Sequence, residues 1–123
     1  MVLVDTNIWI NLYRKKTAEI GQKIWTLVRS NDAAVCGQVW VEFLGGFRDP
    51  ARRRRYEDQL RAYPFLETPR KAYDIAADLL ASYPRLGPGD AIVAATAIAN
   101  DAELWTADRD FDELAGDGLR LFA

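Results

Sequence analysis

The side chains best placed to do chemistry in this sequence are four carboxylates: Asp5, Glu42, Asp90 and Asp108. The chain has no histidine, which excludes histidine general bases, Ser-His-Asp and Cys-His nucleophile systems, and histidine metal ligands. Hydrolytic chemistry must therefore rest on carboxylates. Carboxylates are preferred ligands of hard cations such as Mg²⁺ and Mn²⁺, so the four residues are candidates for holding such an ion.

Each of the four also has an ordinary explanation when it is taken alone. Asp5 and Asp90 could each cap a helix, Glu42 could lie on a solvated helix face, and Asp108 could belong to a turn. These explanations do not require the four to meet. Like charges packed together are costly unless a cation neutralises them, so convergence at one place favours a site for one or two divalent ions.

Short apolar stretches alternate with helical patterns along the chain, which predicts an α/β fold with a mostly parallel sheet of four or five strands. We expect strands at Val2–Val4, Ala33–Cys36, Phe65–Leu66, Glu103–Thr106 and Leu119–Phe122. We expect helices at Ile8–Tyr13, Glu19–Arg29, Gln38–Phe47 and Ala51–Tyr63, another from Thr68-Pro69 onward, a buried one at Asp90–Asn100, and a helical turn at Phe111–Leu114. Pro84 to Gly89 is expected to be a loop.

The expected elements bring the acidic residues to one edge of the sheet. Ligands of parallel sheets bind beyond the carboxyl ends of the strands. Asp5 and Asp108 follow strands there, Asp90 opens the buried helix, and Glu42 lies in the helix after the second strand. Gly45 and Gly46, with Gln38, share the face of Glu42 and would leave room beside its carboxylate.

The length of 123 residues predicts one domain over residues 1–123. No stretch of about 18 apolar residues is present, so we expect no membrane span. The N-terminus lacks the basic and cleavage regions of a signal peptide, and the single Cys36 fits a reducing compartment. These features together predict a cytoplasmic protein.

The ordered set of sequences around the four acids resembles the PIN-domain family. It consists of Val4-Asp5-Thr6-Asn7, Glu42 with Gly45-Gly46, Gly89-Asp90-Ala91-Ile92-Val93-Ala94-Ala95 and Thr106-Ala107-Asp108-Arg109-Asp110-Phe111. It is most similar to the VapC toxins of prokaryotic toxin–antitoxin pairs. The resemblance implies a three-layer α/β/α fold and Mg²⁺- or Mn²⁺-dependent endoribonuclease activity with one or two ions. It also implies a homodimer and inhibition by a cognate VapB-like antitoxin.

The resemblance also assigns roles to individual residues. Asp5, Glu42 and Asp90 match the acidic metal-site positions of the family, and Asp108 matches the fourth. Around them, Thr6 or Asn7 would hydrogen-bond Asp5 or a metal-bound water, Thr106 would support Asp108, and Asp110 would be an additional outer acid. Two alternatives stay open: a PIN-type nuclease of RNA processing that is not a toxin, and a non-catalytic RNA- or protein-binding PIN module.

A run of arginines is the one prominent basic feature. Arg52, Arg53 and Arg55, with Arg48 nearby, are candidate contacts for RNA phosphates or for an acidic antitoxin segment. The alternative is a solvated helix face, because consecutive residues point around a helix rather than along one side.

Overall fold

The computed structural model describes residues 1–15 and 17–123, and its centre is a parallel sheet with the strand order β3-β2-β1-β4-β5. The strands are β1 (Val2–Val4), β2 (Ala33–Cys36), β3 (Phe65–Leu66), β4 (Glu103–Trp105) and β5 (Arg120–Leu121). Every pairing is parallel. The predicted α/β class and the parallel sheet are confirmed, with five strands.

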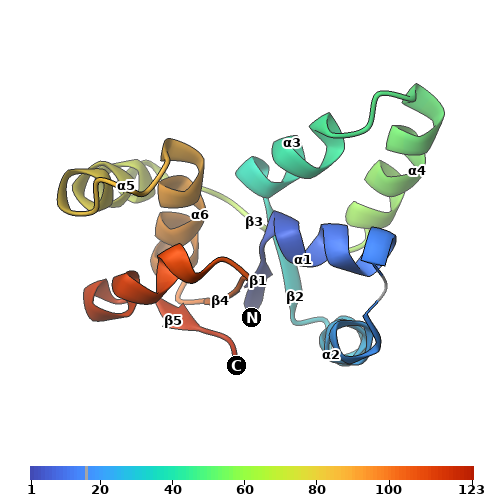
Figure 1. The fold of residues 1–123 in the computed structure, drawn as a ribbon, viewed down its shortest axis with the longest axis horizontal. Helices are drawn as coiled ribbons and strands as arrows, with labels where there is room; N and C mark the ends of the chain where they lie inside the picture. The colour runs from blue at the N-terminus through green and yellow to red at the C-terminus, as the bar shows by residue number, and fades with distance from the viewer. Residues whose placement is uncertain (16) are drawn as a thin grey trace.

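Helices cover both faces of the sheet, which makes the fold three-layered (Figure 1). On one side lie α1 (Thr6–Ile10), a π-helical segment (Asn11–Lys15), α2 (Ala18–Arg29), α3 (Gly37–Gly45) and α4 (Pro50–Leu60). On the other lie α5 (Arg70–Ser82), α6 (Pro88–Ala99) and the 3-10 segment η2 (Arg109–Asp117). This arrangement follows from right-handed crossovers, because the chain first moves from β1 toward β3 and then back to β4 and β5.

Several element boundaries differ from the sequence prediction, and two of the differences affect the position of acidic residues. The first helix begins at Thr6 rather than Ile8, because the Asp5 side chain caps it by accepting a hydrogen bond from the Thr6 amide. The loop expected from Pro84 to Gly89 is shorter, since Gly87 is the N-cap of α6 and Pro88 occupies its first turn. Asp90 therefore lies inside the first turn of α6 and is not its cap.

The core holds the carboxyl ends of the strands in place. The side chains of β1 and β2 are buried throughout, and Trp9 packs beneath them with no exposed surface. Its indole Nε1 donates to the carbonyl of Val4 over 3.0 Å, which ties α1 to the residue before Asp5. On the opposite face, α6 is buried along Val93–Ala97, because its small side chains allow close packing. No helix in the described part of the chain is long and apolar enough to cross a membrane.

Candidate acidic active site

The acidic residues gather where the strand order changes direction, between β1 and β4. Val4 pairs with Trp105 at the ends of these strands, and the amide of Asp5 donates to the carbonyl of Trp105 over 2.9 Å. Asp5 follows β1 directly and Asp108 lies three residues after β4. Such a switch point leaves a crevice at the carboxyl ends of the strands, and parallel α/β folds bind ligands there.

Asp5 is the buried centre of this site, with 5% of its surface exposed. Its Oδ1 accepts from the amide of Thr6 over 2.8 Å. Its Oδ2 accepts from Oγ1 of Thr106 over 2.8 Å and from Nδ2 of Asn7 over 3.3 Å. Burial raises the pKa of Asp5, the hydrogen bonds from Thr106 and Thr6 lower it, and the charges of Glu42 and Asp108 raise it further, so that the net shift is upward.

The segment after β4 is bound to Asp5 through two side chains. Oγ1 of Thr106, which donates to Asp5, also accepts from the amide of Asp108 over 3.0 Å. Oδ1 of Asn7 accepts from the amide of Ala107 over 3.0 Å. Thr106 thus contacts Asp108 through the backbone. Asp108 in turn accepts at Oδ1 from the amide of Asp110 over 2.9 Å and caps η2.

Glu42 approaches the site from the exposed side of α3. Its Oε1 accepts from Nε2 of Gln38 over 2.8 Å, and its Oε2 accepts from Oγ1 of Thr6 over 3.0 Å. A Cβ added to Gly89 would lie 2.7 Å from Oε1 of Glu42 and 2.8 Å from Nε2 of Gln38. The first turn of α6 therefore touches this pair through a glycine.

Contrary to the sequence prediction, the space beside the carboxylate of Glu42 does not come from Gly45 and Gly46. An added Cβ at Gly45 would meet nothing within 4 Å, and one at Gly46 would meet only backbone atoms of α3. The small residue facing Glu42 is Gly89, and Gln38 binds its carboxylate directly. These two contacts were missed because they depend on how α3 packs against α6. The only sequence signal was the four-residue spacing that places Gln38 beside Glu42.

The pKa of Asp90 shows that the acidic side chains lie close enough to repel one another. Its pKa is raised from the usual 3.8 to about 6, first by burial and then by the charges of Asp5, Asp108, Glu42 and Asp110, in that order. All the acidic residues singled out from the sequence therefore contribute to one negative region. Its location in the first turn of α6 places Asp90 near free amide groups, which favour an anion.

The donor chemistry of this region fits a hard divalent cation. Its carboxylates carry oxygen donors, and their mutual repulsion, which raises the pKa of Asp90 and adds to that of Asp5, is what a bound cation would relieve. Within residues 1–15 and 17–123, no three acidic side chains are close enough together to coordinate one ion. Glu42 is held by Gln38 and Thr6 instead.

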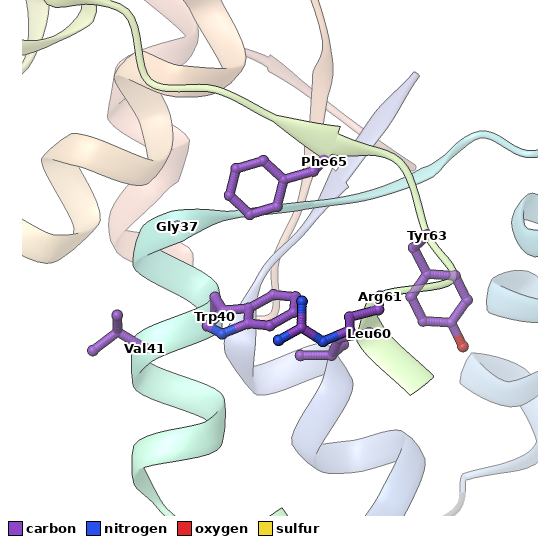
Figure 2. A pocket seen from close by; sticks show the side chains of 7 residues that line it. All are labelled: Gly37, Trp40, Val41, Leu60, Arg61, Tyr63 and Phe65. Atoms are coloured by element: carbon purple, nitrogen blue, oxygen red, sulfur yellow. The ribbon is translucent and has the colours of Figure 1, made fainter. Parts of the chain in front are cut away.

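The predicted basic contacts separate into two groups. Arg48 and Arg52 line a hollow together with Arg14, whereas Arg53 and Arg55 lie on the exposed surface of α4 and do not line it. A different hollow of about 630 Å³ lies beside α3 (Figure 2). Its lining is mostly apolar and includes none of the acidic residues: Gly37, Trp40, Val41, Leu60, Arg61, Tyr63 and Phe65.

The fold has counterparts among known proteins. The family model of the PIN domain matches residues 2–117. No protein with a curated description matches the sequence.

Three solved structures have nearly the same fold over almost the whole chain. A toxin–antitoxin complex from Klebsiella pneumoniae is 26% identical with a TM-score of 0.80, and the match covers 94% of each chain. VapBC2 from Rickettsia felis, bound to a promoter DNA fragment, is 20% identical with a TM-score of 0.83, covering 99% of this chain and 98% of the other. DNA-bound VapBC from Salmonella typhimurium is 19% identical with a TM-score of 0.83, covering 98% and 96%.

Proposed function

This chain belongs to the PIN domain family, and on that premise we propose that it is a Mg²⁺- or Mn²⁺-dependent endoribonuclease. In this proposal residues 1–123 act as one PIN domain. The protein is the toxin of a type II toxin–antitoxin pair, of VapC type, and works in the cytoplasm. The likeness to toxin–antitoxin complexes supports the toxin role.

The single observation that carries the proposal is the shared negative region around Asp90. Four other carboxylates raise the pKa of this residue, and the group lies at the strand switch point where parallel α/β folds bind ligands. Helix caps alone would not require Glu42, which is on a different helix, to face the same space. A site with this charge and no histidine suits metal-assisted hydrolysis.

In the proposed reaction Asp5, Glu42, Asp90 and Asp108 hold one or two ions. When bound, Mg²⁺ or Mn²⁺ lowers the pKa of a coordinated water and neutralises charge on the phosphate. Thr106 and Asn7 fix the Asp5 carboxylate through its Oδ2. Hydrolysis of this kind would join a water oxygen to phosphorus and break the bond to the 3′ oxygen, and the proton that the water loses would end on the 3′ oxygen. The products carry 5′-phosphate and 3′-hydroxyl ends.

The proposed partners are RNA as substrate, a VapB-like antitoxin and a second copy of the chain. The hollow beside α3 suits the second copy, because Val41 and Phe65 expose 67% and 46% of their surfaces there. Val41 lies on α3, so a dimer formed on this face would bring the α3 helices of the two copies together. The oligomeric state of Val41→Glu, measured by light scattering, tests this: the wild type is expected to be a dimer and the variant a monomer.

Cleavage of a mixed RNA pool tests the catalytic proposal. Purified protein is incubated with Mg²⁺, Mn²⁺ or EDTA, beside Asp5→Asn, Asp90→Asn and the control Glu19→Gln, which removes a carboxylate from the first turn of α2. We expect cutting with metal, none with EDTA, and loss of cutting in the two aspartate variants alone. Cutting that survives EDTA or Asp5→Asn would contradict the proposal.

The same assay separates the two alternatives. A non-catalytic binding module would bind RNA or protein without metal-dependent cutting under any condition. A processing nuclease would cut, but its expression in cells would not arrest growth, and no co-expressed antitoxin would be needed to restore growth. A toxin arrests growth, and Asp5→Asn abolishes the arrest.

A further inference from the structure

A second group of charged side chains lies outside the acidic site, where the connection between α3 and α4 faces the π-helical segment. A hollow of about 620 Å³ is lined there by Tyr13, Arg14, Gly46, Phe47, Arg48, Asp49 and Arg52. We propose that its three arginines, Arg14, Arg48 and Arg52, form an arginine pocket that binds a backbone phosphate of the RNA strand beside the cleaved bond. This inference rests on the proposed ribonuclease function.

The aromatic ring of Phe47 holds two of these arginines in position. The guanidinium carbon of Arg14 lies 6.0 Å from the ring centre, and that of Arg52 lies 5.8 Å from it. Phe47 itself is buried, with 7% of its surface exposed, and packs against Phe43 and Tyr56. Cation–π contacts to a fixed ring restrict the motion of both guanidinium groups. The loss of side-chain conformational entropy when an anion binds is therefore smaller.

The arginine pocket carries an excess of positive charge. Arg14, Arg48 and Arg52 are exposed, and none of them takes part in an ion pair within the described residues 1–15 and 17–123. Asp49 is the single acid in the lining, and it caps α4 by accepting from the amide of Ala51 over 3.2 Å. Three positive charges against one negative charge leave the pocket suited to an anion.

The place of the pocket favours an RNA phosphate over the carboxylates of a protein partner. Guanidinium groups bind phosphate and carboxylate oxygens alike through paired hydrogen bonds, so the location of the pocket has to distinguish the two. The pocket follows the same helix that carries Glu42: at about 1.5 Å per residue, the backbone of Gly46 lies about 6 Å beyond that of Glu42. A strand cleaved beside Glu42 therefore reaches Arg48 within a few nucleotides as it passes the end of α3.

Only part of the arginine run predicted from sequence belongs to this pocket. Arg14, which lies far from the run in sequence, is brought to it by the π-helical segment. Arg54 is two residues after Arg52, so it points about 200° away around α4 and does not line the hollow. Arg54→Ala is therefore a control that removes one exposed arginine of the same helix from outside the hollow.

The test is fluorescence anisotropy with a labelled single-stranded RNA of mixed sequence. All proteins carry Asp5→Asn to keep the RNA intact, and each is checked for folding by thermal unfolding. Arg48→Ala/Arg52→Ala is expected to bind roughly tenfold more weakly at low salt, with Arg14→Ala weakened in the same direction. The slope of log Kd against log salt concentration should fall by about 0.7, the value for one lost phosphate contact to a single strand. Arg54→Ala should match the parent in both respects.

Three results would contradict the inference at different levels. RNA affinity unchanged in the double variant would overturn it and leave the pocket to an acidic protein segment. Equal losses per arginine removed in the double variant and in Arg54→Ala would overturn it in favour of unlocalised charge attraction. No RNA binding by the parent protein would overturn the proposed function itself, and would do so whatever the arginine variants show.

Discussion

Replacing Asp90 by asparagine should stabilise the metal-free protein at neutral pH, although it removes a proposed catalytic residue. The pKa of Asp90 is raised from 3.8 to about 6 in the folded protein. A raised carboxyl pKa means that the folded state binds the proton more tightly than the unfolded state. The stability that this gives is complete below about pH 4 and is lost as the pH rises through about 6. At pH 7.5 the ionised Asp90 therefore opposes folding, and asparagine removes that opposition.

The expected size is about 1 kcal/mol. A shift of roughly two pKa units corresponds to about 3 kcal/mol at 1.36 kcal/mol per unit. Asp90 is only half-buried, so solvent screening leaves about half of this. Loss of a carboxylate from the first turn of α6 costs about 0.5 kcal/mol in helix-dipole energy. The net gain corresponds to a rise in Tm of about 4 °C for a domain of this size.

Thermal unfolding followed by circular dichroism in EDTA measures this difference. Asp90→Asn should melt above the wild type at pH 7.5, and the gap should close near pH 4. Glu19→Gln, which also removes a carboxylate from the first turn of a helix, should show no such rise. Added Mn²⁺ should raise the Tm of the wild type more than that of Asp90→Asn. An Asp90→Asn protein that melts at or below the wild-type Tm at pH 7.5 would refute the electrostatic reasoning.

Two further substitutions test the contacts that hold the site. Thr106→Val removes the hydroxyl that donates to Asp5 and accepts from the backbone of the following segment; metal-dependent cleavage should fall by about 10- to 100-fold, as for other outer partners of metal ligands, and unchanged cleavage would speak against this role. In Gly89→Ala an unshifted Cβ would lie 2.7 Å from Oε1 of Glu42, so the flexible end of the Glu42 side chain must move; the fold should be kept, and Mn²⁺ affinity measured by calorimetry should drop by about tenfold. Gly87→Ala is its control, since a Cβ there meets nothing within 4 Å, and equal effects of both alanines would contradict the steric argument.

Much of the fold was predictable because its signals are local. The runs Val2–Val4 and Ala33–Cys36 are apolar throughout, as expected of strands buried on both faces, and the structure has strands at these residues. The helix boundaries were less accurate. Whether Asp5 or Asn7 begins the first helix depends on which side chain caps it, and several polar residues there are able to do so.

The gathering of the acidic residues was predictable for a similar reason. Asp5 and Asp108 follow strands, and the carboxyl ends of parallel strands meet at one edge of a sheet. The positions of Glu42 and Asp90 depend on the direction of the helices that carry them, and the alternation of strands and helices predicted that direction. The resemblance of the surrounding motifs to the PIN domain was also readable in the chain, and the family match over residues 2–117 confirms it.

Only the tertiary structure decided the contacts between elements that are distant in sequence. The approach of Gly89 to Glu42 depends on the packing of α6 against α3, and the meeting of Arg14 with Arg52 around Phe47 depends on the packing of the π-helical segment against α4. The pKa of Asp90 depends on the distances to four other carboxylates. The sequence determined which residue types stand at the ends of strands and helices, because strand and helix patterns are set by neighbours along the chain. Packing between helices decided which of those residues touch, because it depends on the shape of the whole core.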